Sequence, residues 1–370
     1  MITKRLLLLN GLAILGVVLS HAAGWGTIAM FWWTDRYRPV SVPNYDQLGT
    51  VPYYFLIMIA QLTVWTVPAF LFVSGFFAAF MARGNNATIG WRAVRARLVG
   101  LLVPYLIWSF VIFVGDALDH VIYSPGEYLW RLLKGGAHPS YYFVPLLCSF
   151  YLISPWLVRL ARVRWKALLL GAALVQLMTQ VLSYLQVFGA PIPGLDLVLK
   201  LLPTYLLVWF AVYFPLGLIC GLHVDEFKLW LRRSRSYLLP ITILLGFLTI
   251  VEPEAIYRLT GIDHRWVALT IPGILYSVAF IFCFLEFGSL PVRFSKVVNR
   301  LGSQSYGIYL LHGKAIELAA RLVYHISPWI LAWQLLFQPI LLFVGLILVL
   351  WSMDTVMRTP ARRYARVLFG

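Results

Sequence analysis

The most constraining feature of this sequence is a series of apolar runs, each about 20 residues long, separated by short loops that carry the charges. As a helix, a run of about 20 residues spans the roughly 30 Å hydrocarbon core of a bilayer. Only 12% of the 370 residues are charged, against about 25% in soluble domains, which excludes a soluble protein. The sequence predicts an all-α, polytopic membrane bundle of about ten transmembrane helices. Their expected ranges are residues 6–23, 53–82, 98–118, 141–160, 167–188, 203–222, 237–251, 266–287, 303–324 and 329–351.

The positions of the basic residues predict the orientation of the bundle, because cytoplasmic loops are enriched in Lys and Arg. Most of the 30 Lys and Arg residues fall at the N-terminus, in alternate loops and in the C-terminal tail. Both termini are therefore predicted to be cytoplasmic. The formal net charge of +16 is explained by this topology signal, so we expect no nucleic-acid partner. The basic segments are residues 4–5, 83–97, 159–166, 228–235, 293–300 and 358–366.

The chain is expected to form a single integral membrane domain, residues 1–370, without a soluble extra domain. Its start also resembles a secretory signal, because Lys4 and Arg5 precede a short apolar stretch with a small-x-small site. We favour a retained first helix, since cleavage would discard a helix whose far end carries His21. The three cysteines lie inside apolar runs without paired spacing, so neither a disulfide nor a metal site is expected.

Ionisable residues concentrate in the ninth expected span, where they are costly and usually functional. Tyr309 and His312 share one helix face, and His312 lies roughly 13 Å from the start of the span, close to the bilayer midplane. Lys314, Glu317 and Arg321 lie on the opposite face, at spacings that allow ion pairs. We interpret these three as a structural network, and a satisfied core histidine is the alternative for His312. Because two faces are polar, this helix is expected to lie inside the bundle.

The first span carries polar groups at two depths. His21 lies roughly 22 Å from the cytoplasmic start of the helix, in the outer half of the bilayer. Asn10 precedes it by eleven residues, so both side chains point the same way about 16 Å apart. This arrangement favours a site open to the outer side, and the alternative is a histidine that reaches the outer headgroups.

Several segments together carry a resemblance to a known family. They are residues 9–21 (LNGLAILGVVLSH), 67–75 (VPAFLFVSG), 97 with 101–109 (LLVPYLIWS), 141–147 (YYFVPLL), 305–312 (SYGIYLLH) and 358–363 (RTPARR). In order and spacing they resemble the membrane-bound acyltransferase family 3, O-acetyltransferase-like integral membrane proteins. Members of that family transfer acyl groups, most often acetyl, onto cell-envelope sugars and related molecules. The resemblance covers almost the whole chain.

The resemblance implies a multi-pass enzyme of the cytoplasmic membrane that needs no metal. It places a catalytic histidine at His21, which we assign as the general base that takes the proton of an acceptor hydroxyl. Ser74, Tyr309 and His312 are the candidates for stabilising the oxyanion or for orienting the acceptor. The expected partners are an acyl-CoA donor, most simply acetyl-CoA, and a carbohydrate or lipid-linked acceptor.

The expected donor site is a basic cluster at the cytoplasmic mouth. Arg92, Arg95 and Arg97 could bind the phosphates of acyl-CoA, as the similar arginine cluster of the family implies, and ordinary loop charge is the alternative. The sequence departs from the family at Asn10, where a basic partner of the catalytic histidine is expected. Either Arg5 reaches up from below, or another cation substitutes, or Asn10 makes a neutral hydrogen bond to the donor.

Two other classes of function fit the same features. A multi-pass transporter or flippase of a lipid-linked sugar or small molecule would also need many helices and a polar midplane, and a membrane scaffold would need no site. We favour an enzyme, because two intramembrane histidines serve chemistry better than a conduit. Residues 24–52 and 126–134 are expected to include interfacial segments, and the aromatic residues 31–33 could stack on sugar rings.

Overall fold

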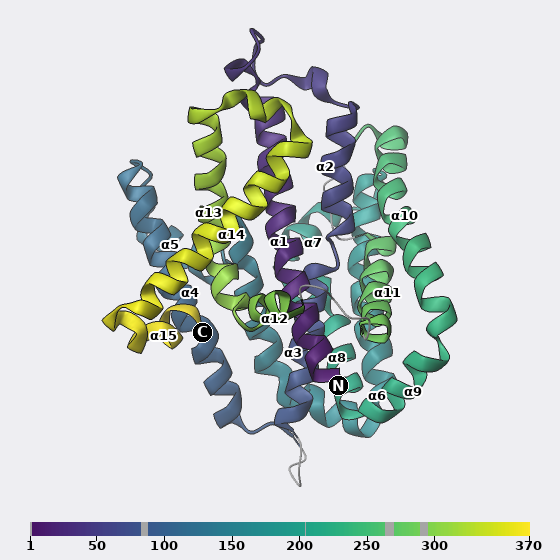
Figure 1. The fold of residues 1–370 in the computed structure, drawn as a ribbon. Coiled ribbons are helices and arrows are strands. Elements are labelled where there is room, and N and C mark those ends of the chain that lie inside the picture. Colours follow the sequence, from purple (N-terminus) through teal and green to yellow (C-terminus); the bar gives the residue numbers. More distant parts are fainter. Residues whose placement is uncertain (1, 83–87, 204, 263–269, 289–294) are drawn as a thin grey trace.

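A computed structural model of the chain describes residues 2–82, 88–203, 205–262, 270–288 and 295–370, all of whose regular elements are helices (Figure 1). This confirms the predicted all-α class. The basic residues 83 and 293, and the first residues of the expected span 266–287, lie outside the described part. The α-helices are α1 (Ile2–Trp32), α2 (Val51–Leu62), α3 (Thr66–Met81), α4 (Trp91–Leu118), α5 (Pro125–Lys134), α6 (Phe143–Val187), α7 (Leu195–Leu201), α8 (Tyr213–Leu222), α9 (Val224–Arg233), α10 (Arg235–Thr260), α11 (Ile271–Phe287), α12 (Ser295–Ser303), α13 (Ser305–Ile326), α14 (Gln334–Arg358) and α15 (Ala365–Phe369).

Six segments of the described chain are helical, long and apolar enough to cross a membrane. They are α1, the pair α2–α3, α4, α6 with the turn before it, α10 and α14, and the shorter apolar helices are α8 and α11. The predicted count of about ten is therefore not confirmed. The main reasons are that two expected spans form one helix, α6, which kinks at Arg164, and that α13 carries too many charges to count as apolar.

The first helix is longer than predicted. It continues past the expected end at residue 23 to Trp32, so its 31 residues extend roughly 46 Å, well beyond the hydrocarbon core. Beyond it, short 3₁₀ turns lead into α2 at the end of the molecule opposite the N-terminus, whereas the start of α4 and α9 lie near the N-terminus (Figure 1). Three of the basic segments thus share one end of the bundle, and its assignment to the cytoplasm stays a prediction.

The segment 126–134, expected to be interfacial, forms the amphipathic helix α5. Ser124 caps it, since its side chain accepts the Glu127 N–H and Glu127 accepts the Ser124 N–H. These bonds to Ser124 lower the pKa of the Glu127 carboxyl. Trp130 and Leu133 are exposed on the apolar face, as expected of a helix that lies along an interface.

The helices α3 and α8 pack at very close range through glycines. An added side chain at Gly75 would overlap the Phe214 carbonyl, and one at Gly217 would overlap the Phe72 carbonyl. Small residues of this kind let the backbones of membrane helices approach each other. The contact fixes α3, which carries several residues of the candidate site.

We expect Gly217→Ala to lower the free energy of unfolding by about 1–3 kcal/mol, because the new Cβ overfills the α3–α8 contact. The measurement is thermal unfolding of the purified protein in detergent. Gly171→Ala is the matched control, since Gly171 is also helical but has nothing within 4 Å of the added carbon. Equal melting temperatures for the two variants would contradict the packing described here.

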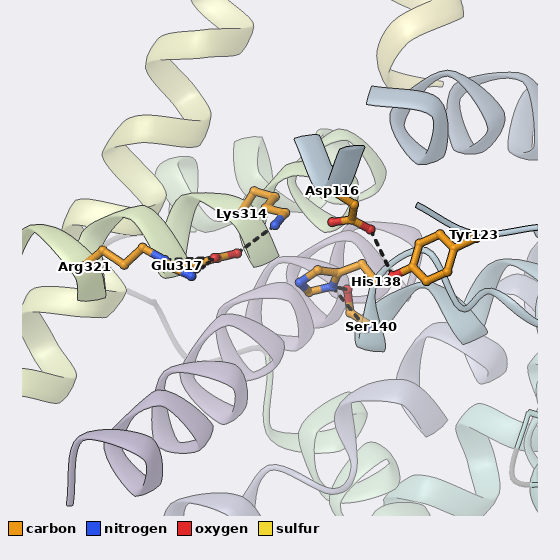
Figure 2. Close-up of polar contacts among 7 residues, drawn as sticks. All are labelled: Asp116, Tyr123, His138, Ser140, Lys314, Glu317 and Arg321. Carbon is orange, nitrogen blue, oxygen red and sulfur yellow. Dashed lines mark hydrogen bonds and ion pairs between the residues drawn. The ribbon is translucent and has the colours of Figure 1, made fainter. Parts of the chain in front are cut away.

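The charged residues of α13 form the expected pairs but not in the expected place. Glu317 lies 2.9 Å from the Lys314 Nζ and 2.9 Å from the Arg321 Nη2 (Figure 2). However, the side chains of Lys314 and Arg321 are 51% and 59% exposed. The expectation that α13 lies inside the bundle is therefore wrong only for Lys314 and Arg321: α13 packs on α1 and α14, and the Glu317 side chain is only 20% exposed.

Candidate functional site

Three histidines from distant parts of the chain converge inside the bundle. His21 comes from α1, His138 precedes α6, and His312 comes from α13. The ring centroid of His21 lies 5.0 Å from that of His312 and 6.5 Å from that of His138. The sequence singled out His21 and His312 separately but missed His138, because a loop histidine before a proline carries no pattern that marks a site.

The hydrogen bond of His312 defines which of its nitrogens is free. Its Nδ1 lies 2.6 Å from the Tyr309 carbonyl oxygen, and because a carbonyl can only accept, Nδ1 carries the proton. In the neutral ring, the Nε2 atom then carries no proton and can only accept a hydrogen bond. It is buried and has no hydrogen-bond partner among the residues that the structure describes. The ring centroid of His21 lies 5.0 Å from that of His312, without a hydrogen bond to this atom.

Two tyrosine hydrogen bonds join the segment that carries His138 to α13, and each of the two segments provides one of the donors. Tyr141 donates its hydroxyl to the Leu310 carbonyl, 2.6 Å away, and Tyr309 donates its hydroxyl to the Ser140 carbonyl. The Nδ1 of His138 accepts the Ser140 N–H at 3.2 Å and lies 2.8 Å from the Ser140 Oγ (Figure 2). The position of His138 is therefore fixed by its own segment.

Gly313 makes room for the ring of His138. A side chain at this position would overlap that ring, so only glycine leaves the space that His138 occupies. On α13 the residue that contacts His138 thus directly follows His312. The sequence gives no sign of this requirement, since nothing in it relates Gly313 to a loop so far away.

His21 faces a cavity of about 410 Å³, the upper cavity. The helical segment of residues 51–81 breaks between α2 and α3 at residues 63–65, and Thr63 and Val64 of this break line the cavity. Polar and aromatic side chains from α1, α3, α11, α13 and the start of α6 enclose it. Its lining includes Val17, Ser20, His21, Thr63, Val64, Thr66, Val67, Phe70, Ser140, Tyr142, Phe143, Phe210, Tyr213, Ser277 and Tyr309.

A second cavity of about 340 Å³, the lower cavity, brings together four of the predicted residues: Asn10, Ser74, Arg97 and Tyr309. Arg97 is the one cation among the described residues that line it. Arg92, Arg95 and Arg97 are all exposed at the start of α4, but Arg92 and Arg95 do not line the cavity. Of the predicted basic cluster, only Arg97 therefore lines a cavity.

The structure excludes one of the three candidates for the basic partner that the family has at the position of Asn10. Arg5 donates its guanidinium to the Leu285 carbonyl at 2.5 Å and to the Glu286 carbonyl at 3.4 Å, at the end of α11. Arg5 is thereby engaged away from the lower cavity and does not substitute for a basic residue at Asn10. The side-chain oxygen of Asn10 is buried without a hydrogen-bond partner among the described residues.

The aromatic residues 31–33 line neither of the two cavities. Phe31 is buried against Tyr45 and Tyr53, Trp33 packs on Trp25 and Tyr324, and only Trp32 of the three aromatic residues at 31–33 is largely exposed. Within the described residues, no group of three or more His, Cys, Asp or Glu side chains is arranged to hold a metal ion.

Comparison with protein families identifies a family to which the chain is similar. Residues 5–355, nearly the whole chain and all three histidines of the cluster, match a family described as "Acyltransferase domain". No curated protein and no solved structure matches the chain. The match confirms the resemblance predicted from the sequence.

Proposed function

Because the chain belongs to the acyltransferase domain family, we propose that it transfers an acyl group, most simply acetyl, from a cytosolic acyl-CoA to a hydroxyl of a carbohydrate or related acceptor. The six apolar helices and the family identify an integral membrane protein, and we place it in the cytoplasmic membrane. The observation that supports the proposal most is the position of His21, which faces the upper cavity beside the bare Nε2 of His312.

In this proposal His21 is the general base. When substrate binds, one N–H of His21 would donate a hydrogen bond to the Nε2 of His312, a contact that the structure itself does not contain, and the other ring nitrogen would be free to accept. The free nitrogen takes the proton of the acceptor hydroxyl while the oxygen attacks the thioester carbonyl. When the C–S bond breaks, His21 returns this proton to the CoA thiolate, so the products are the ester and CoA. His312 acts as a positioning residue that selects the tautomer of His21, as the third group of a catalytic triad does.

The two hydroxyl candidates receive different roles. The Tyr309 hydroxyl already donates to the Ser140 carbonyl, and Ser74 lines the lower cavity, near Tyr151. We therefore propose Tyr309 as a wall residue and Ser74 as a contact of the donor. The oxyanion is assigned to the Val67 N–H in the first turn of α3, because Val67 lines the upper cavity, whereas the Thr66 N–H already donates to the Thr63 carbonyl and Pro68 has no N–H.

The lower cavity is the proposed path of the donor. At about 340 Å³ it suits the pantetheine arm rather than the whole of CoA, so the nucleotide would remain outside, near the exposed Arg92 and Arg95. Arg97 then binds a phosphate at the wall, and the Asn10 amide hydrogen-bonds to the arm. In this proposal Arg97 acts at the cavity and Arg92 and Arg95 act outside it, whereas the sequence predicted that all three form one phosphate site.

We expect Arg97→Ala to raise the KM for acyl-CoA about 10-fold or more at nearly unchanged kcat, because a charge-assisted hydrogen bond is lost. The variant that combines Arg92→Ala with Arg95→Ala is the comparison. Its effect should be smaller, since neither side chain lines the lower cavity, and it should fall at high salt, because exposed charges are screened. Initial rates across a donor series at two ionic strengths measure both. A larger loss in the double variant would move the phosphate site to the surface cluster.

The proposed function is tested with acetyl-CoA that is radiolabelled in the acetyl group. Membranes that contain the protein are compared with membranes that lack it, and label in a carbohydrate or lipid fraction is measured. The proposal requires label transfer, or hydrolysis of the thioester by the purified protein. A transporter or flippase would do neither. The acetyl content of the cell envelope in a deletion strain would then identify the acceptor.

A further inference from the structure

The upper and lower cavities meet at three aromatic side chains. Phe70 of α3, Phe143 of α6 and Tyr309 of α13 line both cavities. The ring centroid of Phe143 lies 5.9 Å from that of Phe70 and 5.6 Å from that of Tyr309. We call these three residues the aromatic constriction.

We propose that the aromatic constriction determines which acyl group the enzyme accepts, and that it admits unbranched chains and excludes branched or aromatic ones. This inference rests on the proposed function, in which the acyl group enters from the lower cavity and reacts at His21. The constriction would select the acyl group while the donor enters, before the acyl group reaches His21.

The order of residues along each helix supports this location. On α13, Tyr306 lines the lower cavity, Tyr309 lines both, and His312 lies beyond it beside His21. On α3 the order is reversed, because Ser74 lines the lower cavity, Phe70 lines both, and Val67 lines the upper one. On both helices the aromatic constriction lies between the donor cavity and the base.

The constriction is held in place by its neighbours. Tyr309 is anchored by its hydroxyl to the Ser140 carbonyl and stacks on Tyr306, with centroids 6.2 Å apart. Phe143 is 6% exposed and directly follows the 3₁₀ turn that contains Ser140. A wider acyl group must displace rings that are fixed by packing and by a hydrogen bond. Close-packed protein interiors resist such displacement, so width is a property that this site can select.

The test compares butyryl-CoA with isobutyryl-CoA, which have the same number of carbon atoms and differ in width. With radiolabelled acyl groups and membranes that contain the endogenous acceptor, the parent protein is expected to favour butyryl by at least about 10-fold in kcat/KM. Phe70→Ala should bring this ratio to within about 3-fold by raising the rate with isobutyryl-CoA. Phe77→Ala is the matched control, because Phe77 lines the lower cavity alone and should keep the parent ratio.

The outcomes separate this inference from the proposed function. If the parent transfers neither acyl group, nor acetyl, the proposed function fails. If the parent transfers both groups equally well, or if Phe70→Ala and Phe77→Ala leave the same ratio, the constriction does not select. Phe70→Leu and Phe143→Leu, checked for a single size-exclusion peak, provide milder variants in case Phe70→Ala does not fold. Each is expected to shift the ratio in the same direction, and an unshifted ratio in both would overturn the inference.

Discussion

His21→Ala is expected to lose acyl transfer by a factor of roughly 10² to 10⁴ while it still binds acyl-CoA. A positioned general base contributes about this much to the rate. The donor nucleotide would bind near Arg97, at the level of Asn10 and about 16 Å along α1 from His21, so its affinity should change by no more than a few-fold. Transfer at saturating donor and equilibrium binding of acyl-CoA measure the two effects separately.

The matched control for this prediction is His325→Ala. His325 is an exposed histidine at the end of α13, where it contacts Tyr324 and lines neither of the two cavities. It should retain the parent rate. If His21→Ala keeps more than about a tenth of the parent rate at saturating donor, the base is another group. Its closest neighbour His312 would then be the first alternative.

His312→Leu is expected to lower kcat about 100-fold with little change in the KM for the donor. The change removes the acceptor that we propose for His21, and misplacing a catalytic group by about 1 Å can cost this much. A purely structural role would instead lower the yield of folded protein. Initial rates and a melting curve of the same preparation separate the two cases.

Rescue by a side chain that can accept a hydrogen bond gives the sharper readout. His312→Gln places an amide oxygen near the position of Nε2, so it should recover part of the activity that His312→Leu lacks. Equal loss in the two variants, with unchanged melting temperatures, would show that His21 does not depend on this acceptor. It would leave the packing of His312 against α1 as its only role.

The helical segments were predicted well, but their connections were not. The apolar runs at residues 141–160 and 167–188 are helical as expected, yet they form two arms of α6 that kink at Arg164. The run 53–82 is instead broken into α2 and α3 at the wall of the upper cavity. Hydrophobicity reports whether a segment prefers the membrane, and it does not report where neighbouring helices bend or break it.

The predictions for α13 show the same limit at the level of side chains. Helical periodicity correctly paired Glu317 with Lys314 and Arg321, because these contacts are made within one helix. Periodicity could not tell how far neighbouring helices cover each side chain, so Lys314 and Arg321 were wrongly expected to be enclosed. His138 and Gly313 were missed for the same reason, since their contact joins a loop to a helix far along the chain.

The sequence by itself determined that this protein is an all-α membrane protein and that it belongs to an acyltransferase family. Both follow from information local in the chain, because apolar length and charge spacing act within single segments and the family motifs are short. Only the tertiary structure decided that His21, His138 and His312 meet, that Arg97 rather than Arg5 lines the cavity of Asn10, and that two cavities join at an aromatic constriction. These features depend on which helix faces pack together, and that choice is made by the fit of side chains from segments hundreds of residues apart.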